Sequence, residues 1–194
     1  MVIKMNTIIY FVRHGQTDAN KARIFSGQID TPLNDTGREQ VRSTCKLIES
    51  LNISWDIIVS STLSRAFETA QIINRYFPID KNIIQDISAI ERSFGKAEGI
   101  PITDENYQKI MNCAFEDEES EVAIIDRAQN FIKKLLNNYP GKNILVVTHS
   151  HFLKGCFKPY LPELQFNTKT VNAGLSRLIF DENQNCISAD LIMK

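Results

Sequence analysis

The sequence predicts an α/β fold, specifically a three-layer α/β/α sandwich with a mostly parallel central sheet. Short runs of β-branched and aromatic residues alternate along the chain with longer segments whose apolar residues recur at helical spacing. This alternation is typical of a parallel sheet covered by helices on both faces. No repeat, low-complexity tract or Pro/Gly/Ser-rich linker divides the 194 residues, so 1–194 is expected to be one domain.

Each expected element rests on a local signal. The helix at 36–51 would begin with a capping box, in which Thr36 is the N-cap and Glu39 reaches back to it. Pro78 would end the helix at 64–77, and Pro140 would end the helix at 124–139. In chain order, the expected elements are strand 7–12, helix 36–51, strand 57–59, helix 64–77, strand 83–90, helix 124–139, strand 144–147 and a hairpin at 176–193. The stretch 95–119, which contains glycine and many acids, is expected to form an irregular lid with solvated carboxylates.

Composition excludes several classes of protein. The chain has 22 basic and 23 acidic residues, which argues against a nucleic-acid partner bound by broad charge neutralisation. No apolar run is long enough to span a membrane and the N-terminus does not resemble a secretory signal, so we expect a cytoplasmic protein without a membrane partner. The 4 cysteines are widely spaced, and we interpret them as reduced, mostly buried thiols. The oligomeric state, monomer or homodimer, is left open.

Polar residues follow four of the expected strands. Arg13-His14 ends the first strand, Ser60 leads from the second to Arg65, Glu91 ends the third and His149 the last. Because the carboxyl ends of parallel strands meet at one edge of a sheet, these side chains are expected to share a crevice. Two imidazoles, two guanidiniums and a carboxylate suit phosphoryl transfer, in which positioning and charge neutralisation supply most of the catalysis.

The chemistry of each residue type suggests a role. Arg13 and Arg65 would clamp phosphate oxygens through paired N–H donors. His14, as a neutral imidazole, would attack phosphorus, and Glu91 would give a proton to the leaving oxygen. Each residue taken alone has a structural explanation: a solvated arginine, a surface ion pair of Glu91, or a hydrogen-bonded histidine at a strand end. The combination favours function, because His14 and His149 end the two strongest strand patterns.

The chain resembles the histidine phosphatase superfamily, also called the phosphoglycerate mutase-like family, over nearly its whole length. The matching blocks occur in the family's order: Arg13-His14-Gly15-Gln16-Thr17 with Asn20, Gly27, Asp30 and Pro32-Leu33; Ser61-Thr62-Leu63-Ser64-Arg65-Ala66 with Glu68-Thr69-Ala70; Glu91 with Phe94-Gly95 and Glu98-Gly99; Glu119-Ser120 with Arg127; and Thr148-His149. The resemblance implies a phosphoglycerate mutase-like fold.

The resemblance also implies residue roles. His14 would carry the phosphoryl group, Arg13, Arg65 and His149 would form its pocket, Glu91 would donate the proton, and no metal or other cofactor would be needed. Substrate binding is assigned to the following residues, by the resemblance or by their place in the chain: Asn20, Arg23, Ser26, Gly27 and Ser150. The chain departs from the family in having Ile24 in place of an arginine, with Arg23 one step earlier, Ala19 in place of a tryptophan, and Ser150 in place of a glycine.

The leading hypothesis is a metal-independent phosphomonoesterase of the histidine acid phosphatase type, acting on a small phosphorylated metabolite. The short segment between Glu91 and Glu119 favours it over the main alternative, a cofactor-dependent phosphoglycerate mutase, because similar mutases carry a longer insertion there. A non-catalytic phosphate-binding domain would be compatible with Ala19 and Ser150. A metal hydrolase using His149 and His151 is a further alternative, if both side chains leave a strand end on the same side.

Overall fold

A computed structural model of the chain describes residues 5–77 and 82–193. Its central sheet has six strands in the order β3-β2-β4-β1-β5-β6. The strands are β1 (Thr7–Arg13), β2 (Ile57–Ser60), β3 (Ile83–Gln85), β4 (Asn143–Thr148), β5 (Leu175–Phe180) and β6 (Cys186–Met193). The pairs β3–β2, β2–β4 and β4–β1 are parallel, whereas β5 and β6 add an antiparallel hairpin. The predicted mostly parallel sheet and the terminal hairpin are therefore confirmed.

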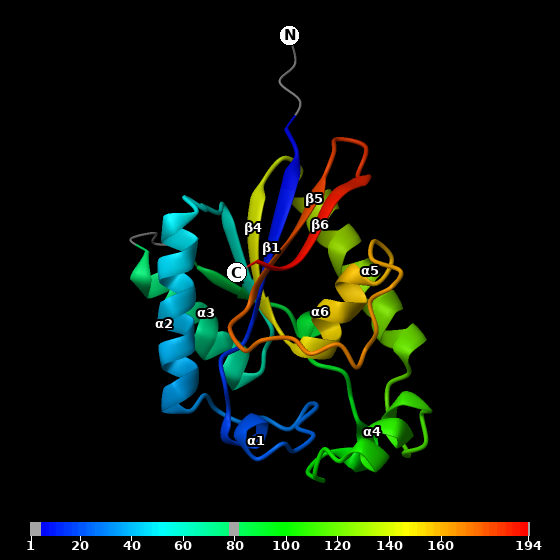
Figure 1. Cartoon of the computed structure of the whole chain (residues 1–194). Helices are drawn as coiled ribbons and strands as arrows, with labels where there is room; N and C mark the ends of the chain where they lie inside the picture. Colours follow the sequence, from blue (N-terminus) through cyan, green and yellow to red (C-terminus); the bar gives the residue numbers. More distant parts are fainter. Residues whose placement is uncertain (1–4, 78–81, 194) are drawn as a thin grey trace.

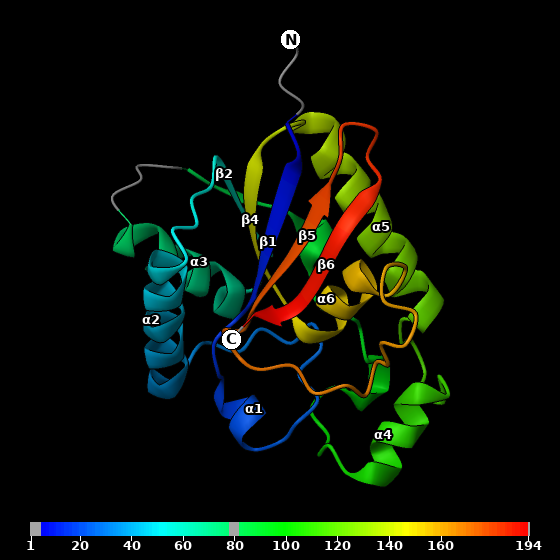
Figure 2. The ribbon, with the colours of Figure 1, turned by 45° about the horizontal axis from the view of Figure 1, so that its top comes forward.

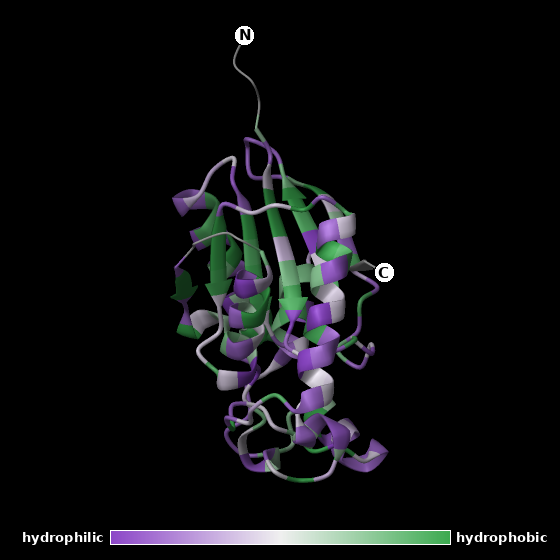
Figure 3. Cartoon of the chain, turned by 90° about the vertical axis from the view of Figure 1, so that its left-hand side faces the viewer, coloured by the Kyte–Doolittle hydropathy of each residue, from purple (hydrophilic) through white to green (hydrophobic). Residues whose placement is uncertain are grey.

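Helices cover both faces of this sheet, as the three-layer prediction requires (Figures 1 and 2). On one face lie α2 (Asp35–Ser50) and α3 (Ser64–Tyr76), and on the other lie α5 (Glu121–Asn138) and α6 (Ser150–Phe157). Alternate residues of β1 supply the two cores: Ile9 and Phe11 pack with α5 and α6, while Tyr10 and Val12 pack with α2 and α3. The strands are accordingly coloured mainly hydrophobic in Figure 3.

Two short helices lie at the end of the sheet where β1 and β4 terminate (Figure 1). They are α1 (Asp18–Lys21), in the loop after β1, and α4 (Asp104–Met111), in the stretch expected to be irregular. A capping box forms at α1, where Thr17 accepts from Asn20 N and Asn20 accepts from Thr17 N. The predicted capping box at Thr36 is wrong, because α2 begins earlier, with Asn34 as N-cap and its side chain accepting from Gly37 N.

Two further predictions need correction. Strand 83–90 is too long, since β3 ends at Gln85 and a 3₁₀ turn, Ile87–Ala89, leads to Glu91. The stretch 95–119 is not wholly irregular, because it contains the 3₁₀ turn Gly95–Ala97 and α4, which bury Ala97 and Ile110 against Phe25 and Phe94. Its carboxylates are only partly solvated. The side chain of Glu118 is 2% exposed and pairs with Arg92 at 3.2 Å.

Several smaller expectations have clear outcomes. Helix α3 ends at Tyr76, and Pro78 lies outside the described residues. Cys45 and Cys156 are buried, but Cys113 is exposed, so only part of the cysteine prediction is confirmed; all four thiols are free. Within the described part of the chain, no helix has the length and apolar character that a membrane crossing requires.

Candidate functional site

The carboxyl ends of β1 and β4 bring His14 and His149 together. Arg13 pairs with Thr148 in the parallel ladder, so the residue that follows each strand emerges at the same edge. The two imidazole rings have centroids 5.1 Å apart and are tilted by 58°. Both are buried, His14 with 3% and His149 with 0% of its surface exposed. The expected meeting of residues far apart in the sequence is therefore observed.

Hydrogen bonding assigns the tautomer of His14. Its Nδ1 lies 2.7 Å from the carbonyl oxygen of Gly15, which can only accept, so Nδ1 carries the hydrogen and Nε2 keeps its lone pair. Burial holds the pKa of His14 well below 6.5, and the nearby charges of Arg65 and Arg13 lower it further. The imidazole is neutral at pH 7, with one nitrogen available to a reacting group.

His149 is oriented by a serine from the neighbouring strand. Its Nε2 lies 2.8 Å from Ser61 Oγ, and Ser61 Oγ also accepts from Leu63 N. The arrangement that uses every donor has Ser61 O–H donating to Nε2, which leaves the hydrogen of His149 on Nδ1. That Nδ1 is buried without a hydrogen-bond partner among the described residues, so it is a donor suited to a bound anion.

Backbone carbonyls position the two predicted guanidiniums. Arg13 Nη1 donates to Thr170 O at 2.7 Å, while Arg65 donates to Gly27 O at 2.7 Å and to Ile29 O at 2.9 Å. Burial lowers the pKa of Arg13 to about 10 and lowers that of Arg65, with Glu91 opposing the shift in both. Both arginines remain cationic at neutral pH. Among the residues that the structure describes, no carboxylate is in contact with either guanidinium. The two buried charges therefore attract an anion to this site.

Glu91 joins the site from a loop, which corrects the expectation that it ends a strand. Its Oε1 accepts from Arg92 N, His151 N and Phe152 N at 2.9–3.0 Å, whereas Oε2 makes a longer contact of 3.3 Å with His151 N. Two of these N–H groups belong to the first turn of α6, where the helix dipole favours a carboxylate. One oxygen is thus fixed, and the other has only a weak partner.

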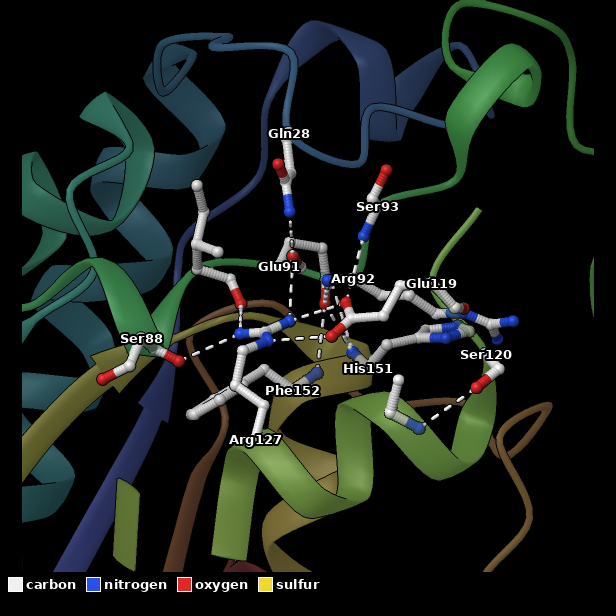
Figure 4. Close-up of polar contacts among 12 residues, drawn as sticks. Gln28, Ser88, Glu91, Arg92, Ser93, Glu119, Ser120, Arg127, His151 and Phe152 are labelled. Atoms are coloured by element: carbon white, nitrogen blue, oxygen red, sulfur yellow. Dashed lines mark hydrogen bonds and ion pairs between the residues drawn. The ribbon is translucent and has the colours of Figure 1, made fainter. Parts of the chain in front are cut away.

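Arg127 holds the backbone around Glu91 (Figure 4). From α5 it donates to the carbonyls of Ser88, Ile90 and Glu91, at 2.9, 2.8 and 3.3 Å, and forms a paired contact with Glu119 at 2.8 and 2.7 Å. Gln28 Nε2 donates to the same Glu91 carbonyl at 3.1 Å. These contacts explain how an irregular segment can present Glu91 in a defined place.

The position of Gly27 has no room for a side chain. Its φ is +48°, and a Cβ there would lie 2.0 Å from Glu98 Oε1. The Glu98 carboxylate cannot move away freely, because it accepts from the backbone N–H groups of Gln28, Ile29 and Phe94 at 3.0–3.1 Å. Glu98 therefore fixes the loop whose carbonyls hold Arg65.

These groups line a cavity of about 320 Å³. Its wall includes the predicted residues Arg13, His14, Asn20, Ser26, Gly27, Arg65, Glu91 and Ser150. His149 is not among the residues that line the cavity, but its ring contacts that of His14, which does. Asn20 has its Oδ1 engaged by Thr17 N and Asn172 Nδ2, which leaves its amide N–H groups for a ligand. Ser150 bonds Thr170 at 2.7 Å, so its hydroxyl is tied to the loop that also holds Arg13.

Arg23 is predicted to bind the substrate, but it does not line this cavity. It lines a second hollow beyond Ile102 and Tyr107, and adopts a positive φ of 55°. Arg23 O accepts from Ile102 N at 2.7 Å, and Ile102 lines both cavities. Arg23 therefore lies outside the wall of the first cavity, and its contact with a substrate stays a prediction.

Sequence reasoning missed several residues of the cavity wall. Tyr107 and Lys154 line it, as does the segment 167–170, which precedes β5. A lysine within the apolar run Phe152-Leu153-Lys154-Gly155-Cys156-Phe157 is a signal that could have been used, because a cation in a buried helix needs a reason. No comparable local pattern marks Tyr107 or the loop.

The suggested metal pair does not form as expected. His149 is the N-cap of α6 and His151 lies inside the helix, so they do not leave a strand on one side. His149 contacts Ser61, whereas His151 Nε2 contacts Tyr107 Oη at 3.3 Å. Across residues 5–77 and 82–193, no group of three or more His, Cys, Asp or Glu side chains is arranged to hold a metal ion.

Comparisons with known proteins agree on one family. The family model of the histidine phosphatase superfamily (branch 1) matches residues 9–189. An uncharacterised phosphatase of Bacillus subtilis, PhoE, is 37% identical over 181 residues, which cover 92% of this chain and 91% of that protein. Phosphoserine phosphatase from Entamoeba histolytica, solved with 3-phosphoglyceric acid, has a TM-score of 0.77 and 25% identity, covering 95% of this chain and 96% of its own. Phosphoglycerate mutase from Bacillus anthracis, at 19% identity, shares the fold with a TM-score of 0.84 and covers 97% of this chain and 93% of its own.

Proposed function

Because the chain belongs to the histidine phosphatase superfamily, we propose that it is a phosphomonoesterase of the histidine acid phosphatase type, acting through a phosphohistidine on His14. The observation that carries the proposal is the neutral His14 imidazole. Its Nδ1 is fixed by Gly15 O, and its Nε2 is left as a nucleophile between two arginines in a cavity.

In the first step, the lone pair of His14 Nε2 attacks phosphorus and the bond from phosphorus to the leaving oxygen breaks. Glu91 gives that oxygen a proton, so the product leaves as an alcohol. Glu91 suits this role because Oε1 is held by three backbone N–H groups, which leaves Oε2 to exchange the proton. The positive charge that attack places on the His14 ring is stabilised at Nδ1 by the Gly15 carbonyl.

The transferred group carries negative charge on its outer oxygens, and nearby donors would stabilise that charge in the transition state. Arg13 and Arg65 would supply paired N–H groups, and His149 Nδ1 would supply a neutral donor. The free N–H groups of Asn20 would add a fourth contact. All four are pre-positioned by hydrogen bonds to other parts of the protein, so little reorganisation is needed on binding.

In the second step, Glu91, now a carboxylate, takes a proton from water as the water oxygen attacks phosphorus. The bond to His14 Nε2 breaks, inorganic phosphate forms, and the imidazole returns to its neutral state. In both steps the proton moves between Glu91 and the reacting oxygen, and no atom changes its oxidation state. The cavity volume of about 320 Å³ fits a small phosphorylated metabolite rather than a macromolecule.

Phosphate release from p-nitrophenyl phosphate, without added metal, tests the activity. Rapid acid-free quenching after mixing with a ³²P-labelled phosphomonoester should give an acid-labile label on the wild type and none on His14→Ala. His151→Phe, which changes a cavity histidine not assigned to the reaction, is the matched control and should still be labelled. An unlabelled wild type would contradict the mechanism. A wild type that moves phosphate between positions of phosphoglycerate without releasing it would instead identify a mutase.

A further inference from the structure

Lys154 is a buried cation in the wall of the cavity that the proposed mechanism does not use. It lies on α6, one helical turn after His151, and is 3% exposed. Its Nζ donates to the carbonyl oxygen of Phe166 at 2.6 Å. An ammonium group has three hydrogens to donate, so this bond leaves donor capacity beside the cavity.

The charge of Lys154 is not neutralised by an ion pair. Within the described part of the chain, no carboxylate lies within ion-pair distance of its Nζ. Burial lowers the pKa of Lys154 to about 8, a shift that Glu91 opposes and Arg13 reinforces. The side chain is therefore mainly protonated at pH 7, and a buried ammonium with a carbonyl as its partner is stabilised by an anionic ligand.

The neighbouring His151 adds an acceptor but no charge. Tyr107 Oη donates to Phe166 O at 2.8 Å and so accepts from His151 Nε2 at 3.3 Å, which places the His151 hydrogen on Nε2. Nδ1 of His151 is then an acceptor, buried and without a partner among the described residues. Burial holds the pKa of His151 well below 6.5, so of these two buried neighbours Lys154 is the cation.

We propose that Lys154 forms a second anion subsite, which binds a singly charged group, such as a carboxylate, on the leaving-group side of the substrate. This inference rests on the proposed function. Arg13 and Arg65 match the two charges of a phosphoryl group. Glu91 is protonated in the proposed first step, so the charge of the buried Lys154 is left without an anionic partner in the cavity, whose wall also includes the exposed Lys169. A phosphomonoester that also carries a carboxylate balances these charges better than a neutral phosphorylated alcohol does.

A purely structural role for Lys154 can be separated from binding by comparison with Lys158. Lys158, one turn further along, also ties α6 to the following loop, since its Nζ donates to Pro162 O and Leu164 O at 2.8 and 2.7 Å. It does not line the cavity. Lys158→Met therefore removes the same kind of loop contact without removing a charge from the cavity.

The test measures kcat/KM for pairs of substrates that differ in one group. Phosphorylated glycolate, hydroxypropanoate and hydroxybutanoate are each compared with the phosphorylated diol of the same length, in which a hydroxymethyl group replaces the carboxylate. The wild type should prefer the carboxylate in at least one pair by about 10- to 100-fold, the range expected for a hydrogen bond between charged groups. Lys154→Met should reduce this ratio to near one, Lys154→Arg should restore part of it, and Lys158→Met should keep it.

The ratio is taken within one protein, so an overall loss of activity does not affect it. A wild type that hydrolyses p-nitrophenyl phosphate but shows no carboxylate preference at any length would overturn this inference and leave the proposed function intact. A wild type that hydrolyses no phosphomonoester would instead refute the proposed function. A diol bisphosphate preferred over every carboxylate, with the same dependence on Lys154, would also overturn the assignment to a singly charged group.

Discussion

Lowering the pH should destabilise this protein at unusually mild acidity, because all of its histidines are buried and neutral. The chain has three, and burial holds the pKa of His14, His149 and His151 well below 6.5. Below pH 6.5 the unfolded chain takes up protons at these residues while the folded protein does not. The unfolded state then binds more protons, so the free energy of unfolding falls as the pH falls.

The size of this effect follows from the number of histidines. Between about pH 7 and about pH 5.5, one histidine that stays neutral when folded and is ordinary when unfolded costs at most about 1.2 kcal/mol, and three cost at most about 4 kcal/mol. That is a large part of the total stability of a typical domain, about 5–15 kcal/mol. Carboxylates contribute at lower pH; Arg177, for example, holds the pKa of Asp190 below its usual 3.8.

Urea unfolding followed by the fluorescence of Trp55, the single tryptophan, measures the effect. Buffers must exclude phosphate and sulfate, because an anion that binds the folded protein adds stability of its own. His151→Phe should reduce the loss by about a third, since the ring lies among Phe94, Phe166 and Tyr107, where phenylalanine can pack. A free energy of unfolding that stays constant from about pH 7 to about pH 5.5 would refute the assignment of neutral buried imidazoles.

Two further predictions concern Glu91 and Gly27. Glu91→Gln should slow phosphorylation of His14 by alkyl phosphates by about 10²- to 10⁴-fold but by p-nitrophenyl phosphate far less, because nitrophenolate leaves without a proton; equal losses in the single-turnover rate of phosphoenzyme formation would count against the acid role. Gly27→Ala should lower both the melting temperature and kcat/KM, since the added Cβ meets Glu98 at 2.0 Å and displaces the loop that holds Arg65. Gly99→Ala is its matched control, because φ is +90° at Gly99 but no atom lies within 4 Å of an added Cβ. Backbone strain of about 1–2 kcal/mol is expected there. The kcat/KM of the protein that remains folded should not change. Equal kinetic losses in the two variants would mean that Glu98 does not position Arg65.

Apolar periodicity predicted the parts of the fold that form the core. Strands β1, β2 and β4 and helices α2, α3 and α5 bury continuous apolar faces, and such faces are visible in the sequence. Errors occurred where backbone hydrogen bonding decides the structure. Asn34 and Thr36 are both good N-caps, and only the contact of Asn34 with Gly37 N selects between them. β3 is short because Asp86 accepts from Ser88 N and starts a 3₁₀ turn, a local competition that apolar spacing does not reveal.

The sequence could predict that the candidate site residues meet, because the carboxyl ends of parallel strands lie at one edge of a sheet. These residues are Arg13, His14, Arg65, Glu91 and His149. Glu91 reaches the site by a different route, through the turn after β3 and the grip of Arg127. Glu118 and Arg92 were less predictable, because an acidic run gives no sign of which member will be buried against a cation. Lys154 and Tyr107 come from different helices, α6 and α4, and meet at the carbonyl oxygen of Phe166, and no spacing in the sequence relates them.

One set of charges links the stability of this site to its chemistry. Arg13 and Arg65, the groups best suited to bind a phosphoryl dianion, also lower the pKa of His14 and His149 after burial itself. Removing a guanidinium would therefore weaken anion binding and at the same time make protonation of the imidazole easier, which costs the nucleophile its lone pair. The same coupling explains why the site can contain two histidines at a centroid distance of 5.1 Å: both must stay neutral, and neutral rings pack together without repulsion. The His14 imidazole is therefore positively charged near the arginines only while it carries the phosphoryl group. The negative charge of that group then offsets the repulsion between the imidazole and the guanidiniums.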